Sequence, residues 1–191
     1  DKNSRFIVGL GTRRDIMQLG VQLTTDDGIM TRSFASSSVF SSGNNGSLSN
    51  VNQTNVFTSV EPWKNFQIRL DGTLQSIKSA NPTEFNLEYY KNGALRKTLN
   101  DAHLTLSLIA KPNAKYSQIG VDRNEHTTLS PTFVLKYTRG IEGLFNADFT
   151  YNKLQFLYNQ PIIMGTFGKT IVNLEVGKNF DTVPLALQNI I

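Results

Sequence analysis

The sequence contains no cysteine, which excludes disulfide bonds and thiolate ligands for a metal. It also has little charge: Asp, Glu, Lys and Arg make up 18% of the 191 residues, below the roughly 25% of soluble domains. No apolar run reaches the roughly 18 residues of a membrane-spanning helix, so only strands could carry the chain across a membrane. Low charge with abundant Asn, Ser and Thr fits a membrane β-barrel and a soluble β-sandwich equally well.

Residues that could carry chemistry are scarce, and the only two histidines are His103 and His126. His126 lies in a polar stretch with Asp122 and Glu125, but the spacing matches no metal motif and predicts a solvated loop. There is no G-x-S-x-G nucleophile elbow and no phosphate-binding G-x-x-x-x-G-K-[ST] motif. The net charge of +4 is spread along the chain, unlike a nucleic-acid-binding surface. We therefore predict no enzymatic activity, metal, cofactor or nucleic-acid partner.

The dominant pattern is an alternation of apolar and polar residues with a period of two. Because successive side chains of a strand point to opposite faces, each such segment predicts a strand with one apolar and one polar face. The clearest segments are 17–23, 66–75, 104–108, 133–138 and 172–177, with Val134 the exception to the alternation. Weaker strands are predicted at 6–10, 29–40, 55–60, 84–90 and 149–158. The sequence predicts an all-β, antiparallel up-and-down fold of about ten strands, with no helix.

Turn-forming residues separate these strands. Residues 26–28 and Asn92-Gly93 tolerate positive φ and predict tight turns. Loops are predicted at 43–47, at 111–114 and, as a longer connection, at 116–130. Gly140 and Gly143 bracket a short connection where we expect positive φ, and Gly177 predicts a bulge or a close approach of a neighbouring strand.

The residues alone leave a membrane barrel and a soluble sandwich open. Strand-end aromatic residues, which are Trp63, Tyr89, Tyr90, Tyr137 and Tyr158, are typical of membrane-interface belts but also occur in soluble proteins. Several predicted strands reach the roughly 9–11 residues that a tilted strand needs to cross a bilayer. The polar faces carry charges that would face the interior of a barrel, as a charge ladder that tunes permeation or as simple ion pairs. These candidates are Arg69, Asp71, Lys136, Lys153 and Glu175.

The segment from 131 to 190 carries a longer, more specific pattern. It runs P-x-F-x-L-x-Y-T-x-G-I-x-G, then D-x-x-Y-x-K-L, and ends in E-x-G-K followed by V-P-x-x-L. Its residues are Pro131, Phe133, Leu135, Tyr137, Thr138, Gly140, Ile141, Gly143, Asp148, Tyr151, Lys153, Leu154, Glu175, Gly177, Lys178, Val183, Pro184 and Leu187. This pattern resembles an outer-membrane β-barrel family of the Bacteroidota, of unknown function, whose full-length members carry a carboxypeptidase-regulatory-like domain ahead of the barrel.

The resemblance implies a transmembrane barrel in the bacterial outer membrane, with membrane lipid and other envelope proteins as partners. It implies no mechanism. The chain begins without a signal peptide and lacks the regulatory-like domain, so residues 1–191 are expected to be one partial barrel domain cut from a larger barrel. We expect a structural, accessory or partner-docking role. A porin-like or transporter channel and a soluble β-sandwich adhesin are the alternatives.

Overall fold

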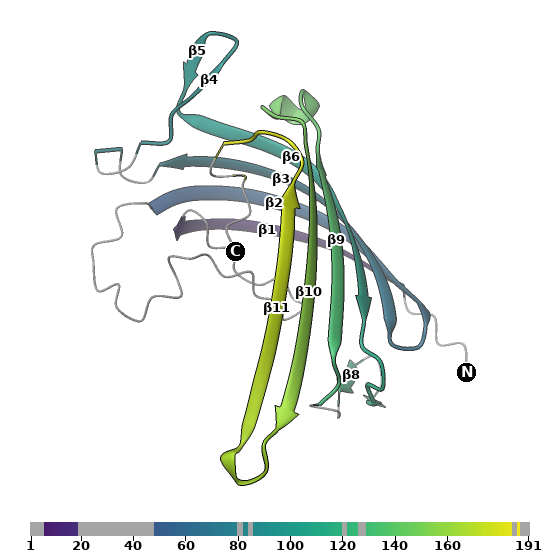
Figure 1. The fold of residues 1–191 in the computed structure, drawn as a ribbon. Coiled ribbons are helices and arrows are strands. Elements are labelled where there is room, and N and C mark those ends of the chain that lie inside the picture. Colours follow the sequence, from purple (N-terminus) through teal and green to yellow (C-terminus); the bar gives the residue numbers. More distant parts are fainter. Residues whose placement is uncertain are drawn as a thin grey trace.

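A computed structural model gives the structure of the protein and describes residues 6–18, 48–79, 82–83, 86–119, 122–125, 129–184 and 187. Its main element is a curved, twisted seven-stranded sheet (Figure 1). In order across the sheet, the strands are β1 (Phe6–Gln18), β2 (Leu48–Trp63), β3 (Phe66–Ser79), β6 (Thr98–Ala110), β9 (Thr132–Gly140), β10 (Tyr151–Ile163) and β11 (Lys169–Asn179). All neighbouring strands are antiparallel, so the predicted all-β, antiparallel architecture is confirmed.

Two short hairpins lie in the connections of this sheet. β4 (Tyr89–Lys91) pairs with β5 (Ala94–Arg96) between β3 and β6, and β7 (Tyr116–Ile119) pairs with β8 (Asp122–Glu125) between β6 and β9. Asn92 and Gly93 join β4 to β5 with φ of 51° and 76°, as the predicted tight turn requires. The longer connection predicted at 116–130 does lie between β6 and β9, but residues 116–119 and 122–125 pair within it as a hairpin and are not an irregular loop.

Most predicted strands agree with the structure. Segments 66–75, 104–108, 133–138 and 172–177 lie within β3, β6, β9 and β11, and the weaker segments 6–10 and 55–60 lie within β1 and β2. Of segment 17–23, only residues 17–18 are described, and they end β1. The strand predicted at 84–90 begins only at Tyr89, and the one predicted at 149–158 begins at Tyr151. Residues 19–47 lie outside the described part of the chain, and with them the strand at 29–40, the turn at 26–28 and the loop at 43–47. The described residues form eleven strands, close to the predicted ten, but four of them are short.

Two complete 3₁₀ turns lie between strands of the described part of the chain, and Leu187 belongs to a further one. The complete turns are η2 (Leu144–Asn146), between β9 and β10, and η3 (Gly165–Phe167), between β10 and β11. In the described part of the chain, no helix has the length and apolar character needed to cross a membrane.

Strand pairing divides the side chains of the sheet into two faces. The polar face includes, in one row across the sheet, Ser59, Arg69, Ser107, Lys136, Gln155 and Gly177. The apolar face includes, in the next row, Thr58, Leu70, Leu106, Tyr137, Leu154 and Lys178. Val134 interrupts the alternation because it lies on the polar face, where it packs in a small apolar cluster with Ile109 and Leu157.

Several charged side chains are buried on the polar face, while many large side chains of the apolar face are exposed. On the polar face, Arg69, Asp101 and Lys153 are only 3–8% exposed. On the apolar face, large side chains are 36–56% exposed, and these are Val56, Leu70, Leu104, Leu106, Phe133, Leu135, Tyr137, Leu154, Phe156, Val172, Leu174 and Val176. The sheet therefore shields these three charged side chains and presents a continuous apolar surface on its other face.

Candidate functional site on the polar face

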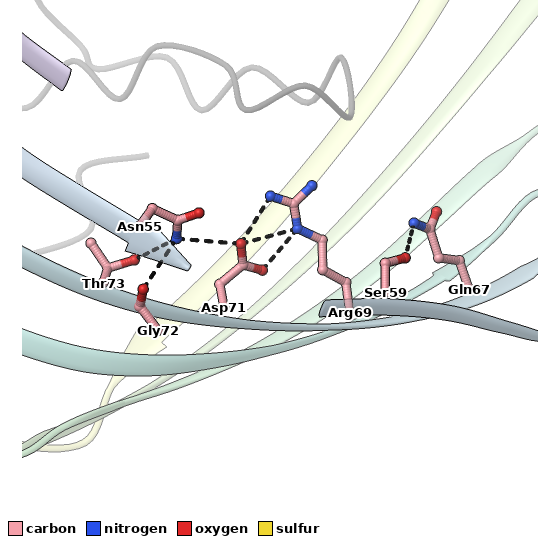
Figure 2. A network of polar contacts seen from close by, with 7 residues as sticks. All are labelled: Asn55, Ser59, Gln67, Arg69, Asp71, Gly72 and Thr73. Carbon is pink, nitrogen blue, oxygen red and sulfur yellow. Dashed lines mark hydrogen bonds and ion pairs between the residues drawn. The ribbon is translucent and has the colours of Figure 1, made fainter. Parts of the chain in front are cut away.

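The first polar cluster joins β2 to β3 around the carboxylate of Asp71 (Figure 2). Arg69 donates to this carboxylate through Nε at 3.0 Å and through Nη2 at 2.9 Å. The Asn55 amide donates to Asp71 Oδ1 at 3.5 Å and to Thr73 Oγ1 at 3.0 Å. The guanidinium of Arg69 also lies 4.2 Å from the ring centroid of Phe57. The ion pair between Arg69 and Asp71 is therefore locked by hydrogen bonds and an aromatic contact.

A second cluster surrounds Asp101 of β6, whose side chain is fully buried. Gln75 donates to Oδ2 at 2.8 Å, and Tyr151 donates to Oδ1 at 3.0 Å. His103 Nδ1 lies 2.7 Å from Oδ2. The carboxylate therefore connects side chains of β3, β6 and β10. The sequence alone does not indicate this cluster, although the alternation through Leu104 places Asp101 and His103 on one face.

Tyr151 is held by a second contact, with Gly140 on β9. The two residues are cross-strand partners, and a Cβ built on Gly140 would overlap three ring carbons of Tyr151. The buried ring thus fills the space that a side chain at Gly140 would need. Gly140 does not have the expected positive φ, whereas Gly143 has it, at 81°. Position 140 therefore requires glycine because the Tyr151 side chain approaches it closely, and not because the backbone turns there.

The three other predicted charges lie on adjacent strands of the polar face. Lys136, Lys153 and Glu175 belong to β9, β10 and β11. Lys153 pairs across the sheet with Thr138 and Asn179, while Lys136 pairs with Gln155. Glu175 interacts electrostatically with Lys136. Among the described side chains, no ion pair within 4.0 Å joins these three residues to one another.

At one end of the sheet, which we call the cap end, Asp148 ties two connections to β6. The Asp148 carboxylate accepts hydrogen bonds from the Asn100 backbone N–H and the Tyr89 hydroxyl, both at 2.7 Å. Lys91 of the β4–β5 hairpin lies 3.6 Å from Asp148 Oδ1 and 3.0 Å from Glu142. Burial, together with the hydrogen bond and charge of Asp148, raises the pKa of the Tyr89 hydroxyl above its usual range.

An apolar cluster, here called the cap cluster, covers the polar face at the same end. It contains Ile77, Leu87, Leu99, Tyr151, Val183 and Leu187, with Tyr89 and Phe149 packed against it. Ile77, Leu99 and Tyr151 come from the sheet, while the others come from the connections and from the segment after β11. In that segment the Pro184 carbonyl accepts a hydrogen bond from the Leu187 N–H.

The remaining predicted residues have structural surroundings. The Tyr137 hydroxyl donates to Asn152, and the Thr138 and Thr105 hydroxyls lie 2.9 Å apart. Lys178 lies over the ring of Phe180, and Pro131 is half-buried before β9. The pairing of β10 with β11 runs unbroken through Gly177, which argues against the expected bulge there.

The metal hypothesis around His126 gains no support. The backbones of Asp122 and Glu125 lie in β8, and His126 is outside the described residues. Within the part of the chain that the structure describes, no group of three His, Asp or Glu side chains could hold a metal ion.

Comparison with protein-family models matches residues 44–188 to the C-terminal domain of a family described as "Family of unknown function (DUF5686)". The chain belongs to this family. Searches of curated proteins and of solved structures found no match. The DUF5686 match includes β2 to β11, and it contains all the residues that carried the resemblance in 131–190. Three of those residues, Asp148, Tyr151 and Lys153, lie at the cap end or on the polar face next to it.

Proposed function

We propose that the chain forms part of a β-barrel in the bacterial outer membrane, with a structural, accessory or partner-docking role in the cell envelope. The apolar face contacts lipid, and the polar face lines the barrel interior. The contrast in burial between the two faces carries this proposal. Exposed leucine, valine and phenylalanine side chains over buried Arg69, Asp101 and Lys153 suit a sheet with lipid outside and polar groups inside.

The direction of the apolar band supports the same arrangement. A row of paired residues runs straight across the strands through Leu70, Leu106, Tyr137, Leu154 and Lys178. On β3 the apolar side chains of this face are centred on Leu70, which lies in the row. On β11 they are centred on Leu174, which lies four residues before the row residue Lys178. From β3 to β11 the centre of this apolar band moves by four residues over four strand spacings. With ~3.4 Å per residue and ~4.8 Å between strands, the band is inclined by about 35° to the row of paired residues.

This inclination has a direct physical meaning. In membrane barrels the strands tilt by roughly 35–45° from the membrane normal, so a band that is level in the bilayer crosses the strands obliquely. The main strands are 9 to 16 residues long, enough for the roughly 9–11 residues of a tilted spanning strand. A soluble sandwich would instead need a second sheet to bury the apolar face.

The cap cluster favours a barrel whose interior is blocked at one end over an open channel. It places apolar side chains of Leu87, Val183 and Leu187 against the polar face at one end. A porin-like or transporter channel remains the second candidate, because charges line the polar face. Conductance across planar bilayers separates the two, since a barrel with a blocked interior gives no ion current.

Fractionation and gel mobility of the full-length protein test the proposal. We expect the protein in the outer-membrane fraction, with a folded band that shifts in mobility on heating in detergent. Recovery from the periplasm in soluble form without detergent would contradict the barrel and favour the soluble adhesin.

A further inference from the structure

The charged residues on the apolar face of the sheet are all cationic. We consider the five adjacent strands β3, β6, β9, β10 and β11, all of whose residues the structure describes. Their positions on the apolar face carry three charged residues, all exposed, which are Lys78, Arg139 and Lys178. The carboxylates of the same strands belong to the polar face, and these are Asp71, Asp101 and Glu175. The apolar face of these strands therefore carries charge of one sign.

The three cations lie at the same end of the apolar band. Each is the last residue but one of a strand that runs towards the cap end, which is β3 for Lys78, β9 for Arg139 and β11 for Lys178. At the opposite end, the positions on the apolar face hold uncharged residues, and these are Phe66, Ala110, Phe133, Ile162 and Thr170. On these strands the band thus has a cationic border at the cap end only.

Arg139 and Lys178 lie at one level of this border. On β9 the apolar side chains of this face are centred on Leu135, and Arg139 follows it by four residues. On β11 they are centred on Leu174, and Lys178 again follows by four residues. With ~3.4 Å per residue and strands tilted by about 35°, both cations lie about 11 Å from the middle of the band along the membrane normal. An apolar band about 25 Å tall ends near this level, so both long side chains reach the headgroup region.

The two cations flank the strand that lies between them. Arg139 pairs with Asn152 of β10, and Lys178 pairs with Leu154, the next residue of β10 on the same face. At ~4.8 Å between strands and ~3.4 Å per residue, their backbones are about 12 Å apart, so both side chains can contact one headgroup. The Asp181 carboxylate lies close by, where it accepts hydrogen bonds from Asn152. Among the described residues, however, neither cation forms an ion pair within 4.0 Å.

We propose that Arg139 and Lys178 bind the phosphate group of an anionic lipid headgroup at the cap-end border of the apolar band. A guanidinium donates paired hydrogen bonds to a phosphate, and the ammonium group adds a second positive charge. Basic residues beside a lipid-facing surface also attract anionic headgroups electrostatically. The inference rests on the proposed function, because it requires lipid against the apolar face. It adds the class of lipid that is preferred and the residues that select it.

Spin-labelled lipids test the site in the full-length protein, reconstituted into phosphatidylcholine vesicles. Electron paramagnetic resonance measures the fraction of labelled lipid whose motion the protein surface restricts, for anionic phosphatidylglycerol and for zwitterionic phosphatidylcholine. Each cation favours an anionic lipid roughly fivefold at its own position, so averaging over all lipids around the barrel leaves a selectivity of about twofold. This selectivity should fall close to one in the double variant Arg139→Gln, Lys178→Gln. Lys97→Gln is the matched control and should keep it, because this exposed lysine lies on the β5–β6 connection and pairs with Glu88.

The phosphatidylcholine signal distinguishes failure of the site from failure of the barrel. Equal restriction of both lipids by the wild type, or unchanged selectivity in the double variant, would overturn the headgroup site while the barrel stands. If the wild type restricts neither lipid, the proposed function and the site both fail. A double variant that still restricts phosphatidylcholine is folded in the bilayer, so its lost selectivity reports lost headgroup contacts. The single variants should each lose part of the selectivity, and they replace the double variant if it does not fold.

Discussion

The ring of Tyr151 lies across Gly140 on the neighbouring strand, so closely that it leaves no room for a side chain at position 140. The same tyrosine reaches the buried carboxylate of Asp101 through its hydroxyl. One aromatic residue therefore fixes the spacing of β9 and β10 and joins both to β6. It is also part of the cap cluster, so its position links the sheet to the segment after β11.

The contact predicts that Gly140→Ala destabilises the fold. The added Cβ would overlap the Tyr151 ring, and displacing a packed ring costs about 1–3 kcal/mol. Gly72→Ala is the matched control within the sheet, because its Cβ would meet Leu104 at an ordinary 3.5 Å. Urea unfolding of both variants, followed by the mobility of the folded band, gives the comparison. Equal midpoints for the two variants would show that the ring does not hold this position.

Tyr151→Phe isolates the hydroxyl from the ring. It keeps the packing on Gly140 but leaves the buried Asp101 carboxylate without one donor, at an expected loss of about 1–3 kcal/mol. Tyr137 lies in the same row as Lys178, at the edge of the apolar band, and its hydrogen-bond partner Asn152 also donates to Asp181. Water can therefore replace the lost hydrogen bond of Tyr137→Phe, and we expect a loss below about 1 kcal/mol. The free energy of unfolding of each variant is measured in urea. A loss in Tyr137→Phe as large as in Tyr151→Phe would contradict the importance of the Asp101 cluster.

Asp148→Asn should loosen the β4–β5 hairpin while leaving the sheet intact. The change removes the charge that attracts Lys91 and weakens the acceptor for Tyr89 and the Asn100 N–H. We expect the amides of residues 89–96 to exchange with deuterium roughly tenfold faster or more. Glu142→Gln removes only the exposed partner of Lys91 and serves as the control. Unchanged exchange in Asp148→Asn would show that other contacts anchor the hairpin.

The raised pKa of Tyr89 predicts a stability effect in alkali. The unfolded hydroxyl titrates near pH 10. Since the folded pKa is raised, the contribution of Tyr89 is fully present below about pH 10 and is lost as the pH rises towards the folded pKa. Tyr89→Phe should therefore flatten the decline of stability above about pH 10, measured as the unfolding midpoint at successive pH values. An identical decline in the wild type and the variant would contradict the raised pKa.

The sequence predicts the faces of the sheet better than it predicts the clusters on them. Alternation is a local property, so the apolar side chains of Leu104, Leu106 and Leu108 directly assign the opposite face to Asp101 and His103. The partners of Asp101 are 26 and 50 residues away in the chain, at Gln75 and Tyr151, and no local pattern indicates them. Only the pairing of β3, β6, β9 and β10 brings these residues together.

Three errors of prediction involve contacts or pairings that the local sequence pattern does not indicate. The strand predicted at 84–90 begins only at Tyr89, while Leu87 before it packs into the cap cluster. The polar stretch 116–125 lacks an apolar face but still forms a hairpin, because backbone hydrogen bonds do not need one. Gly140 was expected to serve a turn, and its real constraint is a ring from another strand.

The central claim is that the apolar face contacts lipid, and single spin labels in a bilayer test it directly. The chain has no cysteine, so Leu106→Cys and Leu135→Cys on the apolar face, and Gln155→Cys on the polar face, can each be labelled without background. We measure collision of each label with oxygen, which partitions into lipid, and with a water-soluble nickel chelate. The account predicts that labels at Leu106 and Leu135 collide with oxygen and not with the chelate. The label at Gln155 should not show this combination of frequent oxygen collisions and absent chelate collisions. Chelate access at Leu106 and Leu135, or immobilisation of both labels by a second protein layer, would contradict the membrane barrel.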